Sequence, residues 1–340
     1  MNCDRNSIGN CAVFFTANCI KLGISSLPKL AIISRDYLHY QNALAQLKLN
    51  GEFTSVELVW ANKDAEGAPL EQFEYVLANP NIMSRYIEKC HNLLWLQSTW
   101  AGITPLIGKL KRDYQLSGLK DVFGGQMREY VMAYLLYFQR KVPELIANQE
   151  RNEWQQYKIP TLQNQTMGIM GLGSIGRDVA HAAKAFGMKV QSLNASSKPD
   201  VADKHFHLDQ ISAFASSSDV IVNLLPHTPE TNGICDSTFF AAMPMHSIFI
   251  NAGRGNIIAQ ESDLVKALES KQIFAAVIDV FKEEPLPAKH PFWHTERLIM
   301  TNHTAASSQH ELVFQVFSSN LGNITKGQPL SSLINMDLGY

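Results

Sequence analysis

Short apolar runs alternate with stretches of helical periodicity in the first part of the chain. Residues 30–33, 56–60 and 92–96 are apolar runs of the length and composition expected for buried strands. Residues 37–47 predict a helix after the first of these strands, and residues 71–90 predict another before the third. Strands that alternate with helices are typical of a parallel sheet covered by helices.

A second series of strand candidates begins near residue 166, and helical segments separate most of its members. They are residues 167–170, 189–190, 220–224, 248–250, 275–280 and 298–300. This order matches a doubly wound dinucleotide-binding domain. Between the two series, residues 125–145 predict one long helix that is apolar on most sides, which indicates burial against several neighbours. The polar residues 148–165 predict a connection at the surface.

The composition excludes several classes of protein. With 46% hydrophobic and 18% charged residues, the chain has the composition of an ordinary globular enzyme. The net charge of -2 and the pI of about 6.6 give no electrostatic reason to expect nucleic acid or an anionic membrane as a partner. The sequence also has no apolar run near the roughly 20 residues that span a bilayer.

The cysteines and histidines argue against disulfides and metals. The five cysteines are odd in number and show no C-x-x-C spacing, which disfavours a disulfide framework and a structural zinc site. The histidines show no spacing typical of metal ligands, so we expect no metal. A reducing cytoplasm is the location that fits these features best.

The N-terminus contains a short apolar stretch at residues 11–20. It could be a weak targeting signal, but Thr16 and Asn18 interrupt it and the acidic Asp4 precedes it. We therefore favour a loosely packed extension over residues 1–26.

A G-x-G-x-x-G segment occupies residues 171–176, directly after the predicted strand 167–170 and at the start of a helical pattern. In such a segment the first glycine allows a tight turn, the second lets a pyrophosphate approach the backbone, and the third lets the helix pack on the strand. The helix N-terminus offers free N–H groups to phosphates. Glycines that only form a turn are the alternative, which the strand–turn–helix context disfavours. The candidate cofactor-binding residues here are Gly171, Gly173, Ser174, Ile175 and Gly176.

The end of the next predicted strand bears on the choice between NAD and NADP. NAD sites usually place Asp or Glu there to bind the ribose hydroxyls. Residues 193–198 read Leu-Asn-Ala-Ser-Ser-Lys and contain no carboxylate. Ser196, Ser197 and Lys198 could bind a 2′-phosphate, so we expect NADP(H) to be preferred. NAD(H) stays an alternative because the arginine usual at NADP sites is also missing.

Three later segments carry candidate catalytic groups, and each follows a strand candidate. They are N-A-G-R-G at residues 251–255, D-V-F-K-E-E-P-L-P at 279–287 and N-H-T-A-A at 302–306. Ligands bind beyond the carboxyl ends of strands in such sheets, so the three segments can converge there. Hydride transfer to a carbonyl leaves negative charge on the oxygen and calls for a cation and an acid. Arg254 and His303 are suitable types, and a carboxylate such as Glu284 would favour the imidazolium.

Together these segments resemble the D-isomer-specific 2-hydroxyacid dehydrogenases, from about residue 30 to the terminal Gly339 and Tyr340. The resemblance is strongest to the glyoxylate/hydroxypyruvate reductase A branch, through G-Q-M-R-E-Y at residues 125–130 and L-L-P-H-T-P-E-T at residues 224–231. Taken singly, the arginine, glutamate and histidine could be ordinary surface or loop residues. Their order behind the glycine turn makes catalysis the favoured interpretation.

The resemblance implies a role for each of these residues. Arg254 would hold the keto oxygen and carboxylate of the substrate, His303 would donate a proton to the carbonyl oxygen, and Glu284 would hydrogen-bond His303. Glu283 is the rival for the glutamate role, but the family spacing from Asp279 selects Glu284. Asp279 would orient the nicotinamide carboxamide. Further candidate cofactor-binding residues are Leu225, Pro226 and Thr231.

The resemblance also implies substrate-binding residues in the first part of the chain. Residues 98–104 take the place of a loop that binds the substrate carboxylate, with N–H donors from Ala101 and Gly102. Trp60 resembles a side chain that lines the substrate pocket, although an ordinary core tryptophan is an equally good interpretation.

Two positions depart from the family pattern. Asn302 precedes the histidine where the family usually has proline, which predicts a less rigid loop. Thr104 stands where the family tends to have aspartate, which puts the details of that turn in doubt. Neither departure removes a proposed catalytic group.

The expected architecture is an α/β protein of two domains, because 340 residues exceed the usual size of one core. We expect a Rossmann-type doubly wound nucleotide-binding domain at residues 125–304. A smaller flavodoxin-like substrate domain would take residues 27–124 and 305–340, and helical residues 309–322 would return the chain to it.

The sequence therefore predicts a cytoplasmic, NAD(P)H-dependent reductase of small 2-keto acids such as glyoxylate or hydroxypyruvate, and the family resemblance implies a homodimer. Two alternatives remain at this point. One is a non-catalytic regulator that senses nicotinamide cofactor, which the presence of Arg254, Glu284 and His303 disfavours. The other is a dehydrogenase of a larger or phosphorylated 2-hydroxy acid.

Overall fold

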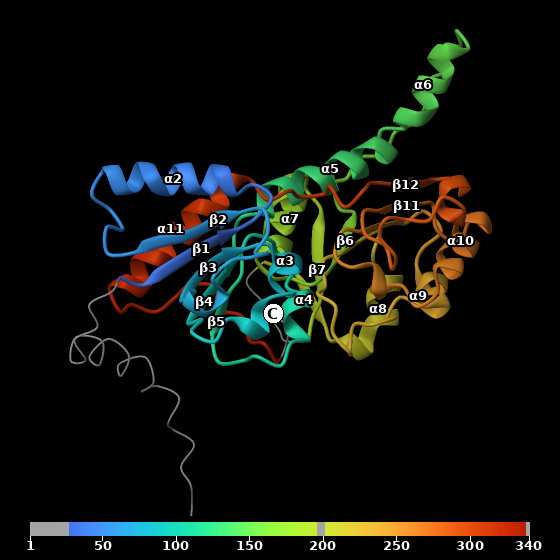
Figure 1. Cartoon of the computed structure of the whole chain (residues 1–340). Coiled ribbons are helices and arrows are strands. Elements are labelled where there is room, and N and C mark those ends of the chain that lie inside the picture. The colour runs from blue at the N-terminus through green and yellow to red at the C-terminus, as the bar shows by residue number, and fades with distance from the viewer. Residues whose placement is uncertain (1–26, 196–200, 338–340) are drawn as a thin grey trace, which may run out of the picture. The chain divides into compact units, whose positions relative to one another are not determined.

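The chain folds into two units, each built on one parallel sheet. The structure is a computed structural model, and it describes residues 27–195 and 201–337 (Figure 1). Among the described residues, 27–122 and 308–337 form unit 1, and 123–195 and 201–307 form unit 2. The predicted domain borders were 124 and 304, and the predicted N-terminal extension lies outside the described residues. None of the helices in the described ranges is long and apolar enough to cross a membrane.

Unit 1 contains a sheet of five parallel strands in the order β2-β1-β3-β4-β5. Its strands are β1 (Lys29–Ile33), β2 (Glu57–Asn62), β3 (Tyr75–Ala78), β4 (Trp95–Ser98) and β5 (Gln115–Ser117). Its helices are α2 (Tyr37–Leu49), α3 (Pro80–Met83), α4 (Thr104–Ile107) and α11 (His310–Thr325). This strand order is that of flavodoxin-like sheets, which confirms the predicted fold class.

Successive residues of β1 point to opposite faces of this sheet. Leu30 and Ile32 pack with α2 and α11 on one face, whereas Ala31 and Ile33 pack with α3 and α4 on the other. Helix α11 joins the core because Val313, Phe317 and Leu321 recur at four-residue spacing on one side of it. The last part of the chain therefore returns to the first sheet.

The helix predicted at residues 71–90 is wrong. The structure places strand β3 inside it, and only the short helix α3 and two 3-10 turns, Leu70–Gln72 and Ile87–Lys89, are helical. All four residues of β3 are buried, so the run shows no alternation and resembles a buried helix by pattern alone. Pro80 then begins α3 at a position where a missing N–H costs nothing.

Unit 2 contains seven parallel strands in the order β12-β11-β10-β9-β6-β7-β8. They are β6 (Thr166–Met170), β7 (Lys189–Leu193), β8 (Lys204–Phe206), β9 (Val220–Asn223), β10 (Ile248–Asn251), β11 (Ala275–Ile278) and β12 (Leu298–Met300). Its helices are α5 (Gly124–Gln139), α6 (Val142–Glu150), α7 (Ser174–Ala185), α8 (Ile211–Ser216), α9 (Ser237–Ala242) and α10 (Glu261–Glu269). Helices α5 and α7 cover one face, and α8, α9 and α10 cover the other. The order reverses between β6 and β9, as in a Rossmann domain.

In this unit one predicted helix is wrong and one strand was not predicted. The helix predicted at residues 125–145 is two helices, because the chain takes a left-handed conformation at Lys141, with φ of 55°, and α6 starts after it. Figure 1 shows α6 extending away from the sheet of its own unit. Strand β8 was not predicted, because its three residues, with two polar side chains, are too short to show a period.

The packing of α11 on unit 1 predicts a large loss of stability for Phe317→Ala. The ring of Phe317 is 0% exposed and stacks on Trp95 with centroids 5.6 Å apart. We expect the free energy of unfolding of unit 1 to fall by about 3–5 kcal/mol, measured by urea denaturation. Leu49→Ala is the control, because Leu49 is 80% exposed. Equal stability of the two variants would contradict this account of the core.

Candidate active site

The predicted site segments of unit 2 begin where its parallel strands end. Asn223 of β9 pairs in register with Met170 of β6 on one side and with Asn251 of β10 on the other, and Asn251 pairs with Ile278 of β11. The residues that follow these strand ends therefore emerge at one edge of the sheet. They are Gly171 after β6, Leu225 after β9, Arg254 after β10, Asp279 after β11 and His303 after β12.

The glycine turn needs two of its glycines for close backbone packing. A Cβ atom on Gly171, whose φ is +97°, would lie 2.9 Å from the carbonyl carbon of Leu224. A Cβ atom on Gly176 would lie 2.4 Å from the carbonyl oxygen of Gly171. At Gly173, in contrast, a Cβ atom would meet nothing within 4 Å. Space therefore adjoins the backbone at the position where a pyrophosphate would approach.

The N-terminus of α7 leaves donors available for an anion. Gly173 precedes the helix, and no side chain caps it in the described part of the chain. The N–H groups of Ser174, Ile175 and Gly176 have no helical partner at this end. Together with the space beside Gly173, these donors fit the diphosphate of a dinucleotide.

Asn194 is a site residue that was not predicted from the sequence, where the absence of a carboxylate and the three residues 196–198 were the signals. The side-chain oxygen of Asn194 accepts the N–H of Leu172 at 2.6 Å and so joins the end of β7 to the glycine turn. Its Nδ2 is buried and has no partner among the described residues. An unpaired donor at the strand end that faces the adenosine ribose in Rossmann domains fits a phosphate or hydroxyl oxygen. Ser196, Ser197 and Lys198 lie outside the described residues.

A pair of buried asparagines, also missed, supports the next two segments. The amide nitrogen of Asn223 donates to the side-chain oxygen of Asn251 at 2.8 Å, and both residues are 0% exposed. Asn223 also accepts the N–H of Leu225 at 3.1 Å, while Asn251 donates to the carbonyl of Arg254 at 3.1 Å. A signal for this pair existed in the sequence, because polar amides end two otherwise apolar strands.

Arg254 lies between the asparagine pair and the acidic segment. Its Nη1 donates to the carbonyl of Gly253 at 2.7 Å. Burial lowers the pKa of the guanidinium and nearby Glu284 raises it, and the group stays cationic at neutral pH because arginine starts far above that range. Gly255 permits this arrangement, since a Cβ atom there would lie 2.0 Å from the carbonyl carbon of Phe281.

The structure brings His303 and Glu284 together. Nδ1 of His303 lies 2.8 Å from Oε2 of Glu284, and Oε1 of Glu284 accepts the N–H of Phe281 at 3.0 Å. Glu284, and not Glu283, is therefore the carboxylate that contacts the imidazole. The His303 side chain is 53% exposed, so a reactant can reach it. Because Nδ1 faces the carboxylate, Nε2 is the ring nitrogen that is left for a reactant.

Asp279 is almost fully buried, at 1% exposed, and its carboxylate binds the segment around the histidine. Oδ1 accepts the N–H of Thr304 at 2.8 Å and the hydroxyl of Thr301, and Oδ2 accepts the N–H of Ala305 at 3.1 Å. Oδ2 has acceptor capacity left for a further donor. The role predicted for Asp279 toward the nicotinamide stays a prediction.

The other predicted cofactor positions form a closed loop after β9. The hydroxyl of Thr231 donates to the carbonyl of Pro226 at 2.7 Å and accepts the N–H of Thr228 at 2.9 Å. Leu225 is buried and belongs to the core under this loop. Thr231 therefore shapes the loop, and any contact that it makes to a cofactor stays a prediction.

In unit 1, the predicted carboxylate-binding loop has donors available. The hydroxyl of Ser98 accepts the N–H of Trp100 at 3.0 Å and bends the chain after β4. Within the described chain, the N–H groups of Ala101 and Gly102 donate to no protein acceptor. Trp60 is half-buried, and its indole N–H donates to the carbonyl of Asp64 at 2.9 Å, which suits a core tryptophan as well as a pocket wall.

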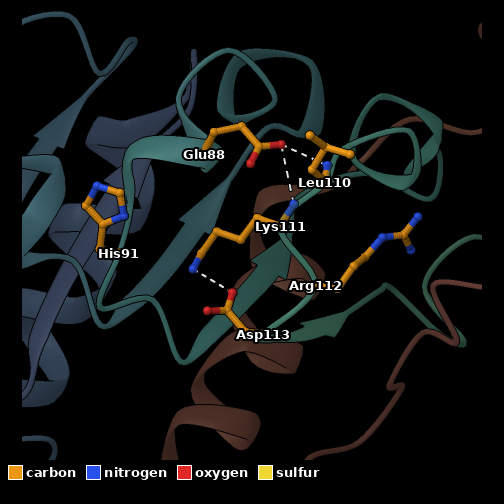
Figure 2. Close-up of a pocket in the computed structure, with 6 residues that line it drawn as sticks. All are labelled: Glu88, His91, Leu110, Lys111, Arg112 and Asp113. Carbon is orange, nitrogen blue, oxygen red and sulfur yellow. Dashed lines mark hydrogen bonds and ion pairs between the residues drawn. The ribbon is translucent and has the colours of Figure 1, made fainter.

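Figure 2 shows a surface hollow of unit 1 that holds none of these residues. It is lined by Glu88, His91, Leu110, Lys111, Arg112 and Asp113. Lys111 pairs with Asp113 at 2.6 Å, and Glu88 accepts the N–H of Leu110 at 2.9 Å. Arg112 donates to backbone carbonyls, among them that of Met336. Because the charged groups of this hollow bind one another or the backbone, they do not indicate a ligand.

Within the described residues, no cluster of His, Cys, Asp or Glu side chains is suited to hold a metal ion.

The glycine turn predicts opposite outcomes for two similar substitutions. Gly176→Ala adds a methyl group that must push against backbone, which we expect to cost about 1–3 kcal/mol of stability. Gly173→Ala adds the same methyl group into space and should change stability by no more than about 0.5 kcal/mol. Thermal denaturation of the two proteins compares them directly. A loss of stability at Gly173 as large as that at Gly176 would show that the turn is packed differently.

Comparison with known proteins identifies the family. A family model described as the NAD-binding domain of D-isomer-specific 2-hydroxyacid dehydrogenases matches residues 132–305. A glyoxylate/hydroxypyruvate reductase A from Serratia proteamaculans is 35% identical over 235 residues, which cover 68% of this chain and 75% of the relative. The corresponding protein of Photorhabdus laumondii is 34% identical over the same lengths.

Solved structures agree with this result. A D-isomer-specific 2-hydroxyacid dehydrogenase family protein from Aeromonas salmonicida is similar with a TM-score of 0.83 and 33% identity, over 92% of this chain and 100% of that chain. An NADPH-dependent glyoxylate/hydroxypyruvate reductase from Sinorhizobium meliloti, solved with NADP and sulfate, has a TM-score of 0.77 and 27% identity over the same shares. These similarities confirm the resemblance inferred from the motifs. The chain belongs to the D-isomer-specific 2-hydroxyacid dehydrogenase family and is similar to its glyoxylate/hydroxypyruvate reductase A branch.

Proposed function

We propose that this protein reduces small 2-keto acids, glyoxylate and hydroxypyruvate, with NADP(H) as the preferred cofactor. The observation that carries the proposal is the contact of 2.8 Å between His303 and Glu284, at the sheet edge that also holds Arg254 and the glycine turn. An acid, an oriented carboxylate and a cation are the groups that carbonyl reduction requires. The named relatives support the substrate class, since several are glyoxylate/hydroxypyruvate reductases.

In this mechanism the guanidinium of Arg254 holds the keto oxygen and the carboxylate of the substrate. The bound nicotinamide would supply the hydride to the carbonyl carbon. His303, as imidazolium, would give its Nε2 proton to the carbonyl oxygen, so that hydride and proton together convert the carbonyl into an alcohol and leave the imidazole neutral. Glu284 holds Nδ1 throughout, which keeps Nε2 directed at the substrate. We further propose that the N–H groups of Ala101 and Gly102 bind the substrate carboxylate.

The preference for NADP(H) is proposed from the end of β7. Asn194 places a neutral amide where NAD-binding domains usually carry a carboxylate, so nothing at that position repels a 2′-phosphate. Ser196, Ser197 and Lys198 are proposed phosphate contacts on sequence alone. The solved relative from Sinorhizobium meliloti, which holds NADP, supports this preference.

We also propose that two copies of the chain associate as a homodimer. The support is an exposed apolar set on and after α6, where Leu145 is 42%, Ile146 49% and Trp154 93% exposed. Large apolar side chains that are exposed in one segment of a chain are candidates for an association surface. A cytoplasmic location stays a prediction from the cysteine content.

The catalytic proposal predicts a clear order among variants in an assay of NADPH oxidation with glyoxylate or hydroxypyruvate. His303→Ala should lower kcat by about 10²–10⁴-fold, the usual contribution of a general acid. Arg254→Ala should raise KM and lower kcat together. Glu284→Gln should lower kcat, and the neighbouring Glu283→Gln is its matched control.

A kcat for His303→Ala within about threefold of that of the parent would show that His303 is not the general acid. Cofactor binding without turnover in the parent would favour a sensing function instead.

The cofactor proposal predicts a change of preference in Asn194→Asp. Aspartate keeps an oxygen that can accept the N–H of Leu172, so the turn should persist, but its charge opposes the 2′-phosphate. We expect the Kd of NADPH, from fluorescence titration, to rise by about tenfold, which corresponds to about 1.4 kcal/mol. The Kd of NADH should fall or stay unchanged. An unchanged Kd of NADPH would show that the phosphate does not lie near Asn194.

A further inference from the structure

Two hydroxyl groups form a chain that ends on Asp279. The hydroxyl of Tyr130, on α5, lies 2.8 Å from Oγ1 of Thr301, which in turn hydrogen-bonds Oδ1 of Asp279. Thr301 has one hydroxyl proton and the carboxylate only accepts, so Thr301 donates to Asp279 and Tyr130 donates to Thr301. Burial raises the pKa of Tyr130, so that its hydroxyl stays protonated and remains a donor.

Asp279 connects these two hydroxyl groups to the segment that carries the histidine. Its carboxylate accepts the N–H groups of Thr304 and Ala305, and its backbone carbonyl accepts the N–H of His303 at 2.8 Å. Three consecutive N–H groups therefore end on one buried residue. His303 has a φ of 55°, in the left-handed region that residues other than glycine seldom adopt. The hydrogen bonds to Asp279 hold the backbone in this conformation, which sets the direction of the imidazole.

Helix α5 contacts the same segment at a second point. The side-chain amide of Gln126 donates to the carbonyl of Ser307 at 2.8 Å and accepts the N–H of Ser307 at 3.0 Å. Gln126 and Tyr130 are four residues apart and so share one face of the helix. Both belong to the G-Q-M-R-E-Y motif at residues 125–130, to which the proposed mechanism assigns no role.

We propose that Tyr130 and Thr301 are positioning residues for the reduction, which act through Asp279 to hold His303 in reach of Glu284. The proposal rests on the proposed role of His303. It adds two residues that keep the imidazole of His303 in the position which that role requires. A packing role is the alternative for Tyr130, since its ring also lies against that of Tyr134, with centroids 4.8 Å apart. Removal of the hydroxyl alone, with the ring kept, separates the two roles.

The experiment compares Thr301→Val, Thr301→Ser and Tyr130→Phe with the parent, and uses Tyr134→Phe as the matched control on the same helix. Thr301→Val should lower kcat by about tenfold, the effect expected for loss of a hydrogen bond to a charged group. The Kd of NADPH should stay close to that of the parent, whereas the melting temperature should fall by a few degrees, because the buried carboxylate of Asp279 loses one donor. Thr301→Ser should restore kcat because it restores the donor. Tyr130→Phe should lower kcat less, and combining it with Thr301→Val should add no further loss, since Tyr130 acts through Thr301.

A second readout is independent of catalysis. Hydrogen exchange of the Thr304 and Ala305 amides, measured in the protein without ligands, should become at least about tenfold faster in Thr301→Val. It should not change in Tyr134→Phe. Unchanged exchange in Thr301→Val, or a kcat within about twofold of the parent, would overturn the positioning role, as would failure of Thr301→Ser to restore kcat. If the parent does not reduce glyoxylate or hydroxypyruvate, the proposed function fails, while faster exchange still establishes the restraint on the 303–305 segment.

Discussion

A buried carboxylate has to find hydrogen-bond donors within the protein, because leaving the charge unpaired away from water is very costly. Asp279 meets this requirement with the hydroxyl of Thr301 and the N–H groups of Thr304 and Ala305. These partners lie after β12, so the carboxylate joins the ends of two neighbouring strands. The same residue begins the segment that leads to Glu284. The carboxylate thus holds the segment that carries the histidine beside the segment that leads to Glu284.

The other strand ends follow the same principle with neutral groups. Asn223 and Asn251 bond to each other and to the backbone of the segments after β9 and β10, which leaves no side-chain amide of this pair unpaired. Glycines complete the arrangement where two backbones approach too closely for a side chain, at Gly171 and Gly255. These contacts join the segments at the edge of the sheet to one another, and the His303 imidazole and the N-terminus of α7 stay accessible there.

Much of the candidate site could be predicted from the sequence, since its residues stand in recognisable local patterns. Arg254, Glu284 and His303 each follow an apolar run within a short motif, and the structure brings Glu284 to His303. The supporting residues carry no such signal. Asn194, Thr301 and Tyr130 are ordinary residue types, and their partners are distant in sequence: Tyr130 and Thr301 are 171 positions apart. Only the folded chain shows that they form one network.

By itself the sequence determined the fold class, most of the strands, and the chemical types at the strand ends, because these depend on local periodicity and short motifs. Tertiary structure decided the type and the limits of those elements for which the local pattern was ambiguous or absent. Residues 75–78 form a strand and not part of a helix, since burial on both faces hides their period. The helix after residue 124 breaks at Lys141, where the chain adopts a left-handed turn that no local pattern demanded. The register of the strands, finally, places Asp279 and its donors side by side, because pairing between distant segments is a property of the whole sheet.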